Sequence, residues 1–432
     1  MKVLLASDGF VTDAVLRTAL ARALPDVETA SISSTWPVPP FRDIGDVREA
    51  AGDEDELIEA LDGCDVAFSH TFPFTEKVVA ASPSLKLVTV CRGGPVNVNI
   101  EAATRAGVLV SYTPGRNATA TAEHTVGMIL ASLRQIPQRH REVVDGQWRS
   151  DYYIFDNVGA EIGSSTVGVV GYGAVGRRVA AVMAAFGARV LVYDPWADKP
   201  AEGMTRVDSL GELLAGSDVV TIHARVTAEN RGMIDADALA LLPEGSVLVN
   251  CARGELVDYD AVCDALDSGR LFAAGFDVLP QEPLPPGHRL LRTPRVTITP
   301  HLAGASKEAA RIAARIGAED IAAFAVGRRP LHLANPEALE ARARLFQAGG
   351  APSGTGAAPS ETDGKTPKVG AAEPEAGEAS SGTGAAPSET DGKTPKVGAA
   401  EPEAGEASSG TGAAAPEADP KTSEDNDQAF GK

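Results

Sequence analysis

The sequence contains no long apolar run. No stretch approaches the roughly 18 uninterrupted apolar residues that a membrane span requires, and the first five residues read as a β-strand and lack the longer apolar core of a signal peptide. The four cysteines show no paired spacing; they are Cys64, Cys91, Cys251 and Cys263. We therefore expect no disulfide framework and no metal site, but buried thiols in a protein of the reducing cytoplasm.

Positive charge is also scarce. Lysine and arginine number 39 against 59 aspartates and glutamates, which gives a formal net charge of −20. Phosphate backbones and anionic lipids are attracted to basic surfaces. Neither nucleic acid nor a membrane is therefore an expected partner.

Beyond about residue 347 aromatic residues nearly disappear. Segment 347–432 consists mainly of Gly, Ala, Pro, Ser, Thr and Glu, and Phe430 is its only aromatic residue. A hexapeptide that begins at Gly354 returns 28 residues later at Gly382 and starts again at Gly410. These repeats have no apolar face to stack on a neighbour, so we predict a disordered, low-complexity acidic tail.

Residues 1–112 alternate short apolar runs with amphipathic stretches, a pattern typical of a parallel sheet flanked by helices. The predicted strands are 2–6, 65–69, 85–91 and 108–111. The predicted helices are 13–24, 54–61, 76–81 and 100–106.

A longer helix is predicted at 119–133, and a second alternating series begins at Thr166. Its strands are predicted at 167–170, 189–193, 218–223, 246–250, 273–278 and 296–299. Six parallel strands are what a dinucleotide-binding sheet requires. An alanine-rich helix at 306–326 is expected to return to the first unit. The predicted fold class is α/β, with two doubly wound parallel-sheet domains followed by the tail.

A glycine-rich turn follows the first strand of the second series. Its sequence, Gly171-Tyr172-Gly173-Ala174-Val175-Gly176, has the spacing of a dinucleotide-binding fingerprint, and a helix is predicted directly after it. The glycines permit a tight turn, a close approach to pyrophosphate and tight helix packing, while the helix N-terminus faces the negative charge. The motif alone is weak evidence in a glycine-rich chain, but its context between strand and helix predicts a cofactor site.

Asp194 ends the next predicted strand. An acid at this place accepts hydrogen bonds from the adenosine ribose and repels a 2′-phosphate. Pro195 and Trp196 follow it, where an NADP enzyme would more often have arginine. The sequence therefore favours NAD; the alternative is a structural glycine turn beside an unrelated surface aspartate.

Three polar residues lie shortly beyond three different strands of the second unit: Arg253, Glu282 and His301. Ligands of such sheets bind beyond the carboxyl ends of the strands, so we expect one crevice. His301 can give a proton to the oxygen of a 2-keto acid. Glu282 would orient the imidazole and raise its pKa, and Arg253 would bind the substrate carboxylate. Taken singly, each could be a capping or surface residue.

Three other side chains of this region have weaker signals. Asp277, at the end of its strand, is a candidate acceptor for the nicotinamide amide, and His223 is a candidate lining of the nicotinamide pocket. We interpret His124, on the long helix, as a packing or interface residue.

Three segments resemble the D-isomer-specific 2-hydroxyacid dehydrogenases: Val-Asn-Cys-Ala-Arg-Gly at 249–254, Asp-Val-Leu-Pro-Gln-Glu-Pro-Leu at 277–284 and His-Leu-Ala-Gly at 301–304. The resemblance covers about residues 1–340. It implies a flavodoxin-like substrate domain of residues 1–112 and 303–340 and a Rossmann NAD-binding domain of residues 113–302. It further implies Cys251 and Ala252 beside the cofactor, a small 2-hydroxy or 2-keto acid as substrate, and homodimers built on the cofactor domains.

In this family, backbone amides of a loop in the first domain bind the substrate carboxylate, and Gly93 and Gly94 stand at that place. The family usually has glycine where this chain has Arg92. Arg92 is thus a candidate second cation for a second anionic group or a sugar acid; the alternative is that it faces solvent or pairs with a local acid. Tyr152 and Tyr153 either reach this pocket or only pack between domains.

Several functions stay open within the resemblance. Phosphoglycerate dehydrogenase and glyoxylate or hydroxypyruvate reductase are the alternatives within the hydroxyacid pattern. Formate dehydrogenases resemble the chain but have Gln at the place of Glu282. A different class is an NAD-sensing binding protein similar to the dehydrogenase-like transcriptional corepressors, for which the tail would dock a partner.

Overall fold

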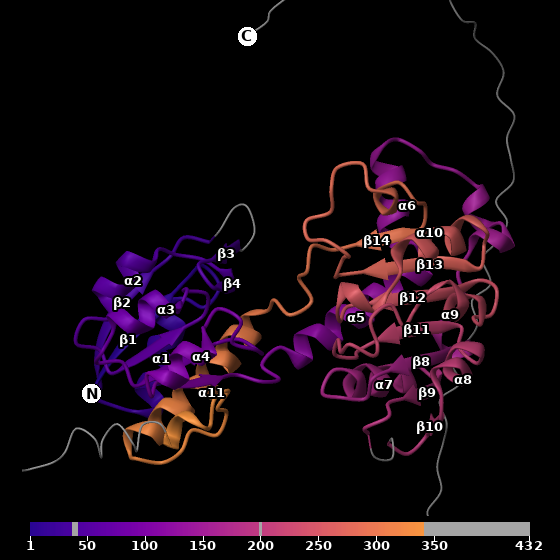
Figure 1. The fold of residues 1–432 in the computed structure, drawn as a ribbon. Coiled ribbons are helices and arrows are strands. Elements are labelled where there is room, and N and C mark those ends of the chain that lie inside the picture. Colours follow the sequence, from indigo (N-terminus) through magenta and orange to yellow (C-terminus); the bar gives the residue numbers. More distant parts are fainter. Residues whose placement is uncertain (37–41, 198–200, 341–432) are drawn as a thin grey trace, which may run out of the picture. The chain divides into compact units, whose positions relative to one another are not determined.

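The computed structural model describes residues 1–36, 42–197 and 201–340. These residues form two parallel sheets with helices packed on them and one short hairpin (Figure 1). The parallel-sheet α/β fold class predicted from the sequence is confirmed. The predicted tail at 347–432 lies outside the described residues.

The first sheet is built from residues 2–112. Its strand order is β2-β1-β5-β6-β7, and every neighbouring pair is parallel. The strands are β1 (Lys2–Ser7), β2 (Glu28–Ser33), β5 (Val66–Ser69), β6 (Leu87–Val90) and β7 (Leu109–Tyr112). The helices between them are α1 (Asp13–Ala23), α2 (Glu54–Ala60), α3 (Glu76–Ala81) and α4 (Ile100–Arg105). This is the flavodoxin-like doubly wound order, in which the direction of winding reverses at β1.

The second sheet has seven parallel strands in the order β10-β9-β8-β11-β12-β13-β14. The strands are β8 (Thr166–Val170), β9 (Arg189–Tyr193), β10 (Met204–Arg206), β11 (Val219–Ile222), β12 (Ser246–Asn250), β13 (Leu271–Phe276) and β14 (Val296–Ile298). The helices α7 (Gly176–Ala185), α8 (Leu210–Ala215), α9 (Ala236–Ala240) and α10 (Tyr259–Asp267) alternate with them. This is the dinucleotide-binding order with one strand added after the sixth, and the winding reverses at β8, directly before the glycine turn.

Two long helices frame the second series in the sequence. Helix α5 (Ala118–Leu133) packs on the second sheet, where Ile129 joins the cluster that contains Val167 and Val249. Helix α11 (Lys307–Ala325) packs instead with α1 and the first sheet, and Figure 1 shows it in orange beside the indigo elements. The predicted domain limits near residues 112 and 303 stay a prediction.

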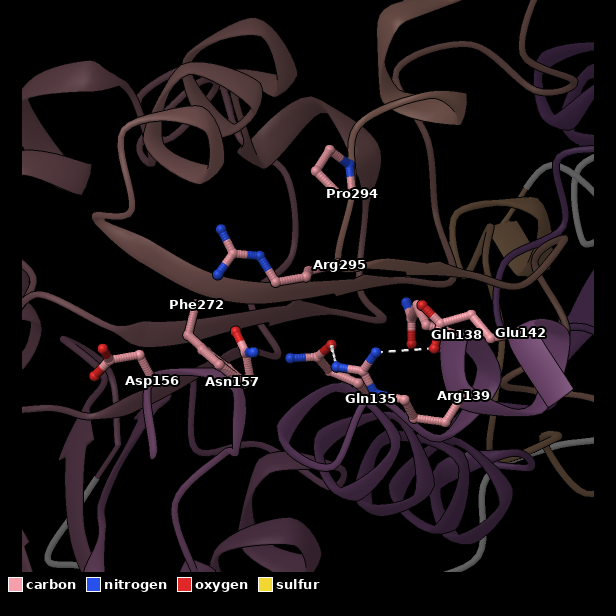
Figure 2. Close-up of a pocket in the computed structure, with 9 residues that line it drawn as sticks. All are labelled: Gln135, Gln138, Arg139, Glu142, Asp156, Asn157, Phe272, Pro294 and Arg295. Atoms are coloured by element: carbon pink, nitrogen blue, oxygen red, sulfur yellow. Dashed lines mark hydrogen bonds and ion pairs between the residues drawn. The ribbon is translucent and has the colours of Figure 1, made fainter. Parts of the chain in front are cut away.

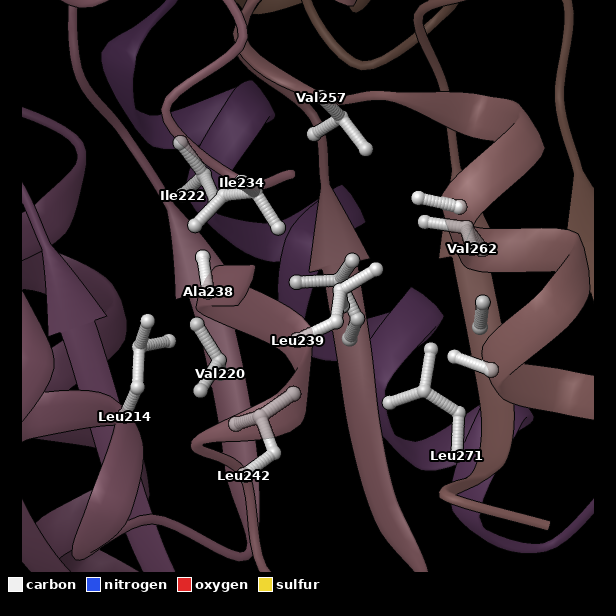
Figure 3. Packing of buried hydrophobic residues seen from close by; sticks show 14 of the residues in the cluster. Leu214, Val220, Ile222, Ile234, Ala238, Leu239, Leu242, Val257, Val262 and Leu271 are labelled. Atoms are coloured by element: carbon white, nitrogen blue, oxygen red, sulfur yellow. The ribbon is translucent and has the colours of Figure 1, made fainter. Parts of the chain in front are cut away.

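The largest apolar cluster lies between the second sheet and helices α8, α9 and α10. Figure 3 shows side chains from strand and helix facing one another here, among them Val220, Leu239 and Val262. Val220 and Val262 are 0% exposed. Full burial of one such side chain contributes about 1.5–3 kcal/mol, so this cluster holds the strand ends that carry the site at fixed positions.

Four strands were not predicted from the sequence: β2, β10, and the hairpin of β3 (Arg42–Ile44) and β4 (Val47–Ala50). Strands β2 and β10 lie at the edges of their sheets, and neither contains a fully buried residue. Strands β3, β4 and β10 are also only three or four residues long. A short or exposed edge strand needs little apolar sequence, so hydrophobic periodicity does not reveal it.

Gly317 determines how closely α11 can approach the first sheet. A Cβ at this position would lie 2.6 Å from Cε2 of Phe68 and 2.9 Å from Cγ2 of Thr89. Gly317→Leu should therefore lower the free energy of unfolding by about 1–3 kcal/mol, measured by urea denaturation. Gly127→Ala is the matched control, since nothing lies within 4 Å of its added Cβ on helix α5. Equal stability of the two variants would contradict this packing.

Candidate active site

The glycine turn that joins β8 to α7 has a shape that fits a dinucleotide. Gly171 has φ +92°, a conformation that glycine adopts without strain, and a Cβ on Gly176 would lie 2.0 Å from the Gly171 carbonyl oxygen. A Cβ on Gly173 would meet nothing within 4 Å, so the turn is open where a pyrophosphate would approach. The Tyr172 side chain is buried in the sheet core, which leaves only its backbone for a cofactor. Ala174 is exposed and Val175 is half-buried.

Asp194 follows β9 and is tied to this turn. Its Oδ2 accepts the Tyr172 amide at 2.7 Å, and its Oδ1 accepts the Trp196 amide at 2.8 Å. Asp194 remains partly exposed, so each oxygen keeps a lone pair for a ribose hydroxyl. Glycine turn and carboxylate together fit a dinucleotide of the NAD type.

Three residues that were predicted to lie beside the cofactor follow β11 and β12: His223 follows β11, and Cys251 and Ala252 follow β12. Burial lowers the pKa of His223 to about 3, and its Nε2 lies 3.0 Å from Thr221 Oγ1. Burial also raises the pKa of the Cys251 thiol to about 12. Ala252, the next residue, is half-buried. All four cysteines are free and buried, as predicted.

A loop braced by Asn250 carries Arg253 beyond β12. The buried Asn250 amide accepts the Ala252 amide at 2.9 Å and donates to the Arg253 carbonyl at 2.8 Å. A Cβ on Gly254 would lie 2.0 Å from the Leu279 carbonyl oxygen, so this loop rests directly on the loop that leads to Glu282. The Arg253 side chain is exposed, and its charge lowers the pKa of His301.

Glu282 and His301 form an ion pair. His301 Nδ1 donates to Glu282 Oε2 at 2.7 Å, and Glu282 Oε1 accepts the Leu279 amide at 3.0 Å. The hydrogen bond and charge of Glu282 raise the pKa of His301 above its ordinary value of 6.5, although burial opposes this. Burial raises the pKa of Glu282 but is outweighed by the hydrogen bond and charge of His301, so the Glu282 pKa is lowered. The pair thus favours the protonated form of His301, with Nδ1 engaged by the Glu282 carboxylate.

The His301 loop is held from behind by Asp277, which is 0% exposed. Asp277 Oδ1 accepts the Leu302 amide at 2.8 Å and the Thr299 hydroxyl at 2.6 Å, and Oδ2 accepts the Ala303 amide at 2.8 Å. Burial raises the pKa of Asp277, but the hydrogen bond of His124 and the three bonds just named outweigh it, so the Asp277 pKa is lowered. The sequence did not predict this structural role, and the contact to the cofactor amide stays a prediction.

His124 belongs to the same network. Its Nε2 lies 3.0 Å from Thr299 Oγ1 and 3.4 Å from Asp277 Oδ1. Because the Thr299 hydroxyl donates to Asp277, it accepts from His124. This link from α5 to the His301 loop was not predicted from the sequence, because residues 124, 277 and 299 are far apart in the chain and no local motif joins them.

Arg92, predicted either as a second cation for the substrate or as the partner of a local acid, pairs with Glu49. Arg92 Nη1 donates to the Glu49 carbonyl at 3.0 Å, and Nη2 forms an ion pair with the Glu49 carboxylate. The local-acid alternative is therefore what the structure shows, and Arg92 is not a free second cation. Within the described residues, the amides of Gly93 and Gly94 donate no hydrogen bond, and a Cβ on either glycine would meet nothing within 4 Å.

Tyr152 and Tyr153 lie in the short 3-10 helix Asp151–Tyr153 that precedes β8. The Tyr152 ring packs under the guanidinium groups of Arg139 and Arg149, whose carbons lie 4.4 and 5.3 Å from the ring centre. Tyr153 is 91% exposed.

A separate cavity of about 310 Å³ lies beside helix α6 (Ile136–Val144). Figure 2 shows Arg139 and Glu142 of this helix paired on one side, with Phe272 and Arg295 on the other. None of the predicted site residues lines it, so it is not the site described above. None of the described helices is long and apolar enough to cross a membrane.

The sequence matches known proteins along most of the described residues. Residues 126–303 match the family described as D-isomer specific 2-hydroxyacid dehydrogenase, NAD binding domain. The chain is 32% identical over 334 residues to a glyoxylate reductase of Korarchaeum cryptofilum, covering 77% of this chain and 99% of that protein. It is 37% identical over 291 residues to a D-3-phosphoglycerate dehydrogenase of Mycobacterium tuberculosis, covering 66% of this chain. That match spans only 54% of the phosphoglycerate dehydrogenase.

The fold is also similar to those of solved structures. An NAD-dependent formate dehydrogenase from Staphylococcus aureus, solved with NAD, superposes with a TM-score of 0.62 at 28% identity. The superposition covers 77% of this chain and 98% of that chain.

Removal of the Glu282 charge should lower the pKa of His301, because the carboxylate is the main influence that raises it. We expect the His301 imidazole in Glu282→Gln to titrate at lower pH than in the unchanged protein, measured by NMR. Glu308→Gln is the control, since Glu308 pairs with Arg311 on the surface of α11. An equal pKa in both variants would mean that Glu282 does not set the proton affinity of His301.

Proposed function

Because the chain belongs to the D-isomer-specific 2-hydroxyacid dehydrogenase family, we propose that it interconverts a small D-2-hydroxy acid and its 2-keto acid with NAD. The observation that carries this proposal is the 2.7 Å pair of His301 and Glu282. A proton donor of raised pKa is what keto-acid reduction requires, since the carbonyl oxygen gains a proton as its carbon gains hydride.

We propose that the two sheets divide the work, with residues 1–112 and 303–340 binding the acid and residues 113–302 binding the cofactor. When bound, the nicotinamide supplies or accepts the hydride. Gly171, Gly173 and Gly176 form the turn that binds the pyrophosphate of NAD, and Asp194 accepts hydrogen bonds from the hydroxyls of its adenosine ribose.

In the proposed reaction, Arg253 pairs with the carboxylate of the acid and fixes its orientation. His301 Nε2 gives its proton to the carbonyl oxygen during reduction and takes it back during oxidation. Glu282 stabilises the imidazolium and holds the ring through Nδ1. The open amides of Gly93 and Gly94 offer further donors to the carboxylate.

The substrate screen that tests this function compares glyoxylate, hydroxypyruvate, phosphohydroxypyruvate and keto sugar acids by NADH oxidation. The similarity to glyoxylate reductase and phosphoglycerate dehydrogenase makes the first three natural choices. Formate oxidation is disfavoured, because Glu282 stands where formate dehydrogenases have Gln. An NAD-sensing binding protein is the alternative from another class, and it would bind NADH without reducing any of these acids.

Replacement of His301 by Gln should lower kcat for keto-acid reduction by a factor of about 100 or more, while the Kd for NADH stays unchanged. In the unchanged enzyme, kcat/KM for reduction should fall as pH rises through the His301 pKa, above 6.5, because only the imidazolium donates a proton. The Glu282→Gln variant should shift this loss to lower pH. Stopped-flow and steady-state assays measure both effects, and near-normal turnover of His301→Gln would remove His301 from its assigned role.

We also propose that the enzyme is a homodimer. The segment between α6 and β8 exposes three large aromatic side chains, Trp148 at 89%, Tyr153 at 91% and Phe155 at 88%. Aromatic surface of this extent on neighbouring positions is typical of a protein interface, and a second copy of the chain is the partner that the family resemblance implies.

Charge placed on this aromatic segment should dissociate the dimer. We expect Trp148→Glu with Phe155→Glu to sediment as a monomer in analytical ultracentrifugation, since a buried unpaired charge is strongly unfavourable. Val326→Glu is the control, an exposed apolar position at the end of α11. If the double variant and the control sediment alike, this segment is not the interface.

A further inference from the structure

Polar side chains gather at the carboxyl edge of the first sheet, where the Gly93–Gly94 loop also lies. Asp8 follows β1, His70 follows β5, Arg92 lies just beyond β6, and Arg116 follows β7. These strands are parallel, so their carboxyl ends share one edge. Both arginines lie close enough to His70 for their charges to lower its pKa.

Asp8 and His70 form a hydrogen bond with each other. His70 Nδ1 donates to Asp8 Oδ2 at 2.7 Å, and Thr71 donates to the same oxygen at 2.8 Å. Asp8 Oδ1 accepts the amides of Phe10 and Val11, each at 2.8 Å. Burial lowers the pKa of His70 and outweighs the hydrogen bond and charge of Asp8, so the neutral imidazole is favoured. Asp8 therefore has its hydrogen-bonding capacity filled without Arg116.

Among the described residues, Arg116 is a half-buried cation at this edge, and two of its three guanidinium nitrogens make no hydrogen bond. Within the described residues, its Nε and Nη1 are buried and have no hydrogen-bond partner. The guanidinium carbon lies 5.9 Å from the centre of the Phe10 ring. Burial is the main cause that lowers the pKa of Arg116; the charge of Arg92 lowers it too, whereas the charge of Asp8 raises it. Burying donors without acceptors is unfavourable, and an anionic ligand would supply the acceptors that Nε and Nη1 lack.

The loop that bears Arg116 is attached to the Gly93–Gly94 loop. The Thr113 amide and hydroxyl both donate to the Arg92 carbonyl, at 2.8 and 3.1 Å. The open amides of Gly93 and Gly94 and the half-buried Arg116 guanidinium thus lie on adjoining loops at one sheet edge. Arg92 contributes no free charge here, since Glu49 pairs with it.

We propose that Arg116 binds a second anionic group of the substrate, so that the enzyme prefers 2-keto and 2-hydroxy acids with a carboxylate or phosphate beyond C2. This inference rests on the proposed function. A guanidinium has five donors and no acceptor, and its planar fork matches both oxyanions. The second cation that the sequence suggested at Arg92 is provided by Arg116.

The test compares full-length wild type with Arg116→Met and Arg116→Lys in NADH-dependent reduction. Oxaloacetate and 2-oxoglutarate carry a second carboxylate, phosphohydroxypyruvate carries a phosphate, and hydroxypyruvate and glyoxylate carry no second anion. We expect wild type to prefer at least one anionic class over hydroxypyruvate by tenfold or more in kcat/KM. Arg116→Met should reduce that preference by about 10- to 100-fold, with hydroxypyruvate changed less than threefold. Arg116→Lys should retain part of the preference.

Arg105→Met is the matched control, since Arg105 pairs with Glu76 on the surface of α4. It should leave all substrates unchanged. The melting temperature of Arg116→Met should equal or exceed that of wild type, because buried donors without partners are removed. A lower melting temperature, with the two variants equally impaired on all acids, would make Arg116 a structural residue and overturn the inference.

A binding measurement separates this inference from the proposed function. In calorimetry with NAD present, D-malate or 3-phospho-D-glycerate should bind wild type more tightly than D-lactate, and Arg116→Met should remove the difference. Reduction of keto acids without such a difference would overturn the inference alone. The binding difference without any reduction would overturn the proposed function alone. Equal weakening of D-lactate would place Arg116 on the common carboxylate and also overturn the inference.

Discussion

Parallel pairing is the constraint on which both halves of this protein depend. Every neighbouring pair in the two large sheets is parallel, so each strand must be followed by a crossover and all strand ends of a sheet open at one edge. Polar residues that follow different strands therefore come together although they are far apart in the sequence. This brings Arg253 to the loop that leads to Glu282, and it gathers Asp8, His70, Arg92 and Arg116 at the edge of the first sheet.

A buried carboxylate, Asp277, fixes the position of the His301 loop at the carboxyl edge of the second sheet. Asp277 accepts two amides of the His301 loop and the Thr299 hydroxyl, and His301 itself has a positive φ of 55°. Such a backbone conformation is unfavourable for a non-glycine residue and persists where the surroundings enforce it. The hydrogen bonds to Asp277 hold the loop backbone in this conformation. The orientation of the imidazole is then set by its hydrogen bond to Glu282.

Histidines of this chain show how environment alone assigns a charge. The hydrogen bond and charge of Glu282 raise the pKa of His301 and so favour its protonated form. Burial lowers the pKa of His223, and it also lowers that of His70 in spite of an adjacent carboxylate. Of these three histidines, His301 is the one with a raised pKa, and its side chain is 52% exposed, so a substrate could reach it.

The sequence alone determined the α/β class, the positions of most strands and helices and the glycine turn, because these follow from short-range periodicity and local backbone geometry. It also predicted the pairing of Glu282 with His301, because strand ends of a parallel sheet converge. Edge strands such as β2 and β10 could not be predicted, since they bury too little apolar surface. Only the tertiary structure showed that Glu49 forms an ion pair with Arg92 and that His124 and Asp277 hold the His301 loop. It also showed that, among the described residues, two buried guanidinium nitrogens of Arg116 make no hydrogen bond. Those outcomes depend on which side chains meet across hundreds of residues, and neither spacing nor composition contains that information.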